Sequence, residues 1–170
     1  MKEINPIEIT DNFIKLISSD WMLITAGDEE KYNMMTASWG GVGELWGKYV
    51  VTAYVRPERY TDEFIARTHR FTLSFFGAGM KKMLGVMGKE SGRNYDKMNY
   101  EGLTSKVLPS GQIAFDEARL VLDCKVLYVE ALKAENFLDK ESLAKWYNDG
   151  PGGSLHNIYV AEIVGAWINE

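Results

Sequence analysis

The chain has 170 residues, of which 46% are apolar and 25% charged, a mixture typical of a globular domain with its own core. A net charge of −5 argues against a nucleic-acid partner, and no stretch approaches the roughly 20 apolar residues of a membrane span. The lone Cys124 excludes an intrachain disulfide, and its apolar surroundings predict a buried thiol. With no signal peptide in residues 1–11, we expect one soluble, cytoplasmic domain over 1–170, without a membrane partner.

The first third of the chain alternates short apolar runs with turns. The expected elements are a short helix over 11–19 capped by Thr10 or Asp11, a strand over 21–26 closed by the turn Gly27-Asp28, its hairpin partner over 33–40, and a break at the glycines from Gly40 to Gly47.

The middle of the chain holds its clearest strand, residues 49–55, which are rich in β-branched and aromatic side chains. Thr61 can cap a helix over 61–68, and residues 71–76 alternate as a strand. The glycine-rich region 77–111 contains a helical piece over 80–87. It is long for a connection, which favours a functional loop or lid.

The last third predicts long strands again. The expected elements are a strand over 118–132, a partly helical segment over 135–146, a turn cluster over 149–153 and a final strand over 158–168. Strands do not alternate regularly with long helices, so the pattern predicts a mainly β fold, a closed or partly open barrel with short helices.

Charge is unevenly distributed. Residues 56–97 hold nine Lys or Arg and five Asp or Glu, a local net charge of +4. A basic middle in an acidic protein suits a small anionic ligand, but a solvated surface of uneven charge explains the count equally well.

Several familiar motifs are absent. The run Gly40-Gly41-Val42-Gly43 lacks the third glycine and the crossover helix of a dinucleotide fingerprint. The two histidines have no neighbouring metal-ligand spacing, and no nucleophile triad can be assigned from spacing.

The turn from Arg56 to Thr61 joins a strand to a helix start, where free backbone N–H groups can hold a phosphate. Arg56 and Arg59 could clamp that phosphate, although an ordinary capped helix with solvated arginines has the same sequence. Residues 33–40 combine Thr36, Ser38 and Trp39, which suit the polar edge and the face of a flavin ring. A hairpin strand with a core tryptophan is the alternative.

Taken in order, five segments resemble the flavin reductase-like family, in particular its flavoredoxin-like branch of FMN-binding split-barrel proteins. The segments are Asn33-x-Met35-Thr36-Ala37-Ser38-Trp39-Gly40, Arg56-Pro57-x-Arg59-Tyr60-Thr61, Phe71-x-x-Ser74-Phe75, Ser91-Gly92-Arg93 with Asp96-Lys97, and Leu155-His156-x-x-Tyr159-x-x-Glu162-Ile163.

The resemblance implies a six-stranded antiparallel Greek-key split barrel that forms a homodimer, with non-covalent FMN near the subunit interface. Residues carried over to the isoalloxazine ring are Asn33, Thr36, Ala37, Ser38 and Trp39. Residues carried over to the ribityl phosphate are Arg56, Arg59, Tyr60 and Thr61, with Ser74 and Phe75 beside them. Lys97 and His156 would approach the site from the loop and from the last strand.

The resemblance also implies the chemistry. Flavin N5 would accept a hydride from NADH or NADPH and pass electrons to a flavin or a small acceptor, so no catalytic side chain is needed. The alternatives are a flavin-binding electron-transfer protein with little NAD(P)H activity, and a barrel that has lost the flavin and mediates protein contacts.

Overall fold

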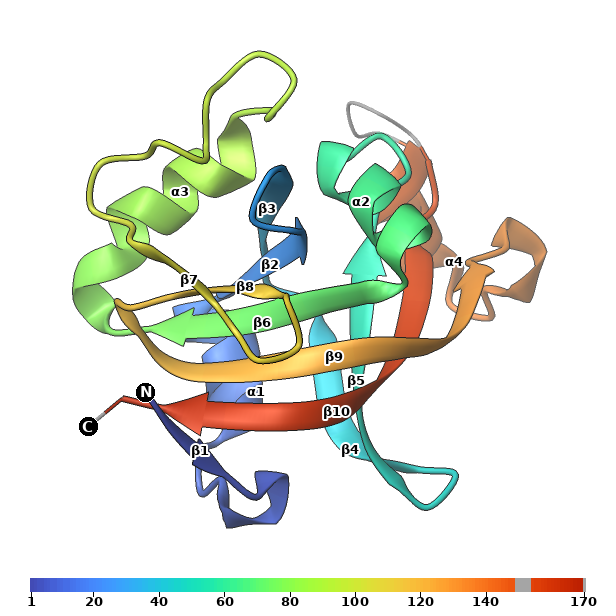
Figure 1. The fold of residues 1–170 in the computed structure, drawn as a ribbon. Helices are drawn as coiled ribbons and strands as arrows, with labels where there is room; N and C mark the ends of the chain where they lie inside the picture. The colour runs from blue at the N-terminus through green and yellow to red at the C-terminus, as the bar shows by residue number, and fades with distance from the viewer. Residues whose placement is uncertain (149–153, 170) are drawn as a thin grey trace.

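The computed structural model describes residues 1–148 and 154–169, so the turn cluster expected over 149–153 lies outside the described residues. Eight antiparallel strands form one curved sheet (Figure 1). Its path runs β3 (Tyr32–Ala37), β2 (Met22–Gly27), β6 (Arg70–Phe76), β9 (Ala118–Ala131), β10 (Asn157–Ile168), β5 (Lys48–Val55) and β4 (Gly40–Leu45), with β1 (Lys2–Ile4) paired to β10.

The predicted mainly β split barrel is confirmed, with an open sheet whose path ends at β3 and β4. It pairs more strands than the six expected, partly because β4 forms where the glycines predicted a break. Backbone pairing with β5 needs no side chains, and Gly41 lies opposite Thr52 in that ladder. A small hairpin of β7 (Ser105–Val107) and β8 (Ile113–Phe115) covers part of the outer face.

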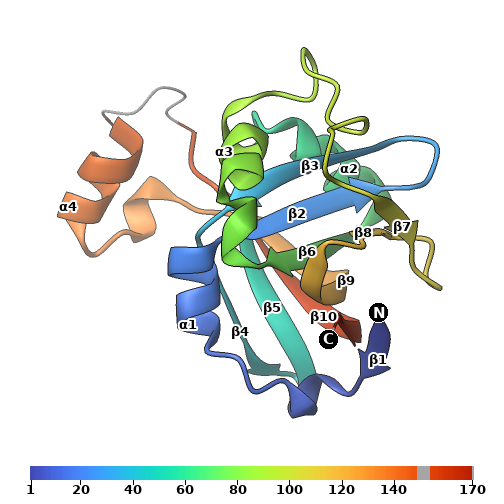
Figure 2. The same ribbon diagram turned by 90° about the vertical axis from the view of Figure 1, so that its left-hand side faces the viewer.

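The helices are short. They comprise α1 (Phe13–Lys15) with a π-helical turn over Leu16–Asp20, α2 (Tyr60–Thr68), α3 (Lys81–Lys89), α4 (Lys140–Leu143) with a π-helical turn over Ala144–Asn148, and single turns at Pro6–Glu8, Ala78–Met80 and Ala134–Asn136. In Figure 2, α4 and its flanking turns project from the side of the barrel. No helix in the described ranges is long and apolar enough to cross a membrane.

Two helix starts differ from the prediction. Asn12, rather than Thr10 or Asp11, caps α1, since its side chain accepts the N–H of Lys15. Helix α2 begins one residue early, after Arg59, and makes no side-chain cap. The Thr61 side chain is buried instead, and its hydroxyl is hydrogen-bonded to the Asn33 side-chain amide on β3.

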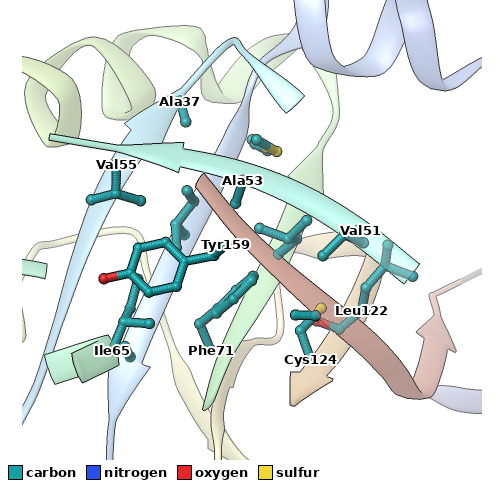
Figure 3. Close-up of a cluster of buried hydrophobic side chains, with 14 of the residues drawn as sticks. Ala37, Val51, Ala53, Val55, Ile65, Phe71, Leu122, Cys124 and Tyr159 are labelled. Carbon is teal, nitrogen blue, oxygen red and sulfur yellow. The ribbon is translucent and has the colours of Figure 1, made fainter. Parts of the chain in front are cut away.

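The sheet buries apolar side chains on both faces. The inner cluster fills the barrel and includes Phe71, Tyr159 and the fully buried Cys124 (Figure 3). The outer cluster packs the sheet against α3 and the β7–β8 hairpin. Strand β6 shows the alternation that the sequence predicted: Phe71, Leu73 and Phe75 enter the inner cluster, whereas Phe76 enters the outer one.

Candidate functional site

A cleft of about 300 Å³ lies at the end of β3. The end of β3, the turn after β5 and the segment after α4 meet there, although they are far apart in the sequence. The residues that line it are Met35, Thr36, Ala37, Ser38, Trp39, Tyr54, Arg56, Arg59, Trp146 and His156.

Aromatic side chains form one side of this cleft. Trp39 packs edge-on against Trp146, with ring centroids 5.1 Å apart and planes at 86°. It also lies against the His156 ring at 5.1 Å and a 48° tilt. Such walls suit a flat apolar ligand, because stacking and edge contacts add to the burial of its surface.

The Arg56 guanidinium fastens the segment after α4 to the barrel. One terminal nitrogen donates to the backbone oxygen of Ser154 at 3.1 Å, and the other donates to that of Trp146 at 2.9 Å. Its carbon also lies 5.3 Å from the centre of the Tyr147 ring. Arg56 therefore borders the cleft while two of its donor nitrogens already serve the backbone.

His156 is held as a neutral hydrogen-bonding ring. Its Nδ1 lies 2.9 Å from the Tyr147 hydroxyl. Burial, together with the positive charge of Arg56, lowers the pKa of His156 to about 4. At neutral pH the ring is uncharged and supports the aromatic wall rather than supplying a cation.

A second, smaller pocket of about 70 Å³ adjoins the cleft, because Met35 and Arg59 line both. Its other lining residues are Asn33, Glu58, Tyr60, Thr61, Lys89, Glu90, Ser91, Gly92 and Lys97. With Arg59 included, the lining has three cationic and two acidic side chains, so the pocket carries a net positive charge.

Two of the cations are fixed by the end of helix α3. The Lys97 ammonium donates to the backbone oxygens of Met87 at 2.9 Å and Met34 at 2.8 Å, and Arg59 donates to that of Gly88 at 2.9 Å. These α3 carbonyls lie in its last turn, where helical partners are missing and cations are favoured.

The charge of Lys97 is costly in this place. The side chain is only 4% exposed, and burial, with the nearby charge of Arg59, lowers its pKa to about 8. Two of its three N–H groups have backbone acceptors, which leaves one without an acceptor among the described residues. An anion in the small pocket would use that donor and stabilise the charged form.

The start of α2 also lines this pocket, through Tyr60 and Thr61. Asn33 is buried against Thr61. With its amide oxygen turned toward α2, it accepts the Thr61 hydroxyl at 2.8 Å and the Thr61 N–H at 3.3 Å. Gly92 closes the pocket so tightly that a Cβ there would lie 1.9 Å from the Asn33 amide.

The structure brings together most of the residues that the sequence singled out. Those that line the cleft or the small pocket are Asn33, Thr36, Ala37, Ser38, Trp39, Arg56, Arg59, Tyr60, Thr61, Lys97 and His156. Ser74 and Phe75 line neither: both are fully buried, and Phe75 packs in the inner cluster 6.2 Å from the Phe13 ring. Their cofactor role stays a prediction.

Sequence reasoning missed other lining residues. Trp146 and Tyr54 border the cleft, and Lys89 and Glu90 border the small pocket. Trp146 lies in a partly helical segment, and the residue spacing of that segment does not indicate a contact with the barrel. Only the contact between Trp146 and Trp39 in the folded chain places it at the cleft. For Lys89 and Glu90, the available signal was the adjacent Ser91-Gly92-Arg93 match.

Comparisons with known proteins identify the family and the fold. The model of the family described as "Flavin reductase like domain" matches residues 14–170. A flavoredoxin from Methanosarcina acetivorans is 24% identical, with a TM-score of 0.66, and the match covers 89% of this chain and 69% of that one. An FMN-binding protein from Thermus thermophilus, solved with bound p-hydroxybenzaldehyde, is 20% identical, with a TM-score of 0.69 and coverages of 100% and 83%.

A third solved structure, the NADH:FAD oxidoreductase SgcE6 from Streptomyces globisporus C-1027, is 16% identical, with a TM-score of 0.64 and coverages of 88% and 75%. At these identities the likeness shows a shared fold. No curated protein gives a significant match.

Proposed function

Because this chain belongs to the flavin reductase like domain family, we propose that it binds FMN non-covalently and acts as a flavin oxidoreductase. Electrons would pass from NADH or NADPH through the flavin to a second flavin or a small acceptor. The observation that carries the proposal is the continuity of an aromatic-walled cleft with a small cationic pocket, joined through Arg59. This matches a flat ring with an anionic tail.

The cleft fits the ring. Trp39 and Trp146 supply apolar faces, and the end of β3 supplies polar groups at Thr36 and Ser38 for the ring's heteroatom edge. Thr36 is itself held in place, since its hydroxyl donates to the backbone oxygen of Leu84 at 2.5 Å. The protein's contribution here is to orient the ring and keep water from one face.

The small pocket fits the phosphate. Arg59 and Lys97 are both held by backbone carbonyls in the last turn of α3, and Lys97 has a donor to spare. The start of α2 lines the same pocket and adds its positive dipole end. Bound FMN would supply hydride acceptance at its N5 atom, a chemistry that this chain's side chains do not provide.

The names of two structural neighbours support a reductase. One is an NADH:FAD oxidoreductase, and another is the styrene monooxygenase flavin reductase of Pseudomonas putida S12. Flavoredoxin among the neighbours favours the second candidate, an electron-transfer protein with little NAD(P)H activity.

Two measurements test the proposal. The purified protein should show the absorption bands of oxidised flavin, or acquire them when FMN is added and free FMN is removed. Mixing the complex anaerobically with NADH or NADPH should bleach those bands rapidly if it is a reductase, and slowly if it only carries electrons. A colourless protein that takes up no FMN would overturn both candidates and leave a barrel that mediates protein contacts.

We further propose a homodimer that covers the flavin site. A groove of about 420 Å³ beside the cleft shares Ser38 and Trp39 with it and is lined otherwise by α1, the π-helical turn that follows it, and β4. Ile14 projects from it with 82% of its surface exposed. Light scattering should give twice the mass of the chain, and Ile14→Glu should lower that mass. A monomeric wild-type protein would refute the proposal.

A further inference from the structure

The two arginines that follow β5 occupy different surroundings, and this inference rests on the proposed flavin site. We propose that Arg59 binds the phosphate tail, whereas Arg56 is a positioning residue that holds Trp146 against the ring. The sequence alone treats the pair as one phosphate clamp. Their contacts in the folded chain separate them.

Arg56 faces the wide cleft and does not line the small pocket. Its terminal nitrogens donate to the Trp146 and Ser154 carbonyls, which come before and after residues 149–153 in the sequence. The guanidinium carbon lies 5.3 Å from the centre of the Tyr147 ring. A guanidinium is suited to this task because its planar fork can serve two carbonyls at once. The consequence is a fixed backbone at Trp146.

Trp146 itself is anchored through its neighbours rather than through its own side chain. Tyr147 is 7% exposed, and its hydroxyl is hydrogen-bonded to His156. Trp146 is 45% exposed and borders the cleft. Its ring meets Trp39 edge-on, so the two indoles together form one side of the cleft. The Trp146 carbonyl accepts a hydrogen bond from the Arg56 side chain, which ties this turn to the barrel.

Arg59 differs in each respect. It lines both the cleft and the small pocket, donates once to the Gly88 carbonyl, and lies close enough to Lys97 to lower that residue's pKa. Two neighbouring cations repel each other unless an anion lies between them. A phosphate would relieve this repulsion at Arg59 and would gain nothing comparable at Arg56.

FMN and riboflavin separate the two roles, because riboflavin has the same ring and no phosphate. Dissociation constants for both are measured by flavin fluorescence quenching on the flavin-free protein. Arg59→Ala should weaken FMN binding about tenfold to a hundredfold and leave riboflavin nearly unchanged, since a charged hydrogen bond of about 1.5–3 kcal/mol is lost. Arg56→Ala should weaken both flavins by the same factor.

Trp146→Ala should reproduce the Arg56→Ala phenotype, and the double variant should be no weaker than the weaker single variant, because both remove one wall. Arg67→Ala and Trp46→Ala are matched controls: each removes the same kind of side chain from an exposed position that lines neither hollow. Both controls should bind like wild type. The urea midpoint of each variant is compared with that of the wild type. Equal midpoints would show that the loss of flavin binding does not come from unfolding.

The outcomes are distinct. If wild type binds neither flavin, the proposed function fails. If wild type binds FMN but Arg56→Ala loses its preference for FMN over riboflavin, or binds both flavins normally, the division of roles is wrong. Should Arg56→Ala not fold, Arg56→Lys decides: the positioning role predicts weaker binding of both flavins by the same factor, because lysine cannot serve both carbonyls. A phosphate role predicts unchanged riboflavin binding and FMN binding close to that of the wild type, because lysine keeps the charge.

Discussion

Replacing Lys97 with methionine tests whether a buried ammonium lies under the small pocket. The pKa of Lys97 falls from 10.5 to about 8 in the folded protein, chiefly through burial and then through the charge of Arg59. Between these two values the unfolded chain binds a proton that the folded chain has released. The free energy of unfolding of the wild type therefore rises with pH across this window.

The size of the rise follows from the two pKa values. From about pH 7 to about pH 9.5 the wild type should gain about 1–2 kcal/mol relative to Lys97→Met, less than the full shift because the window ends below 10.5. Methionine has nearly the same length and no charge, so subtracting the two curves removes every other titrating group.

Urea unfolding of the flavin-free proteins, followed by circular dichroism at several pH values, measures this difference directly. The control is Lys82→Met, which removes an exposed lysine from α3 and should give a difference that does not change with pH. A wild-type minus Lys97→Met difference that stays flat or falls with rising pH would refute the buried-ammonium reasoning.

Three further predictions concern other parts of the fold. Gly92→Ala should displace the Asn33 amide, lower the free energy of unfolding by about 1–3 kcal/mol through lost hydrogen bonds, and weaken FMN binding. Asp123→Ala should cost about 3 kcal/mol in urea unfolding, because Asp123 is 1% exposed and pairs with Arg70 at 2.9 Å. Trp46→Asn should raise stability by about 0.5–1 kcal/mol, because Trp46 occupies a left-handed turn conformation with φ of 57° that asparagine adopts more easily.

Each of these has a contrary result. Unchanged stability and FMN affinity in Gly92→Ala would show that the pocket wall has room for a methyl group. A loss below about 1 kcal/mol in Asp123→Ala would mean that water already screens the pair. A less stable Trp46→Asn protein would mean that the exposed indole makes contacts that outweigh the backbone strain.

Most of the sheet follows from the sequence because strands such as β5 and β6 carry their own alternation. Strand β4 was not predicted, because Gly41 and Gly43 have no side chains that could show an alternating pattern. The strand forms through its backbone pairing with β5. The cleft floor at Thr36–Trp39 and the Arg59 turn were predictable from ordered motifs. Trp146 was not, because its place is decided by long-range hydrogen bonds from Arg56.

The buried thiol offers a practical consequence. Cys124 is the only cysteine of the chain, has no exposed surface, and lies in the middle strand of the sheet, where burial holds its pKa well above the usual range. A thiol reagent can reach it only when the strands separate. The rate at which the unmodified protein is labelled therefore reports how often the sheet opens. It measures kinetic stability without an engineered probe.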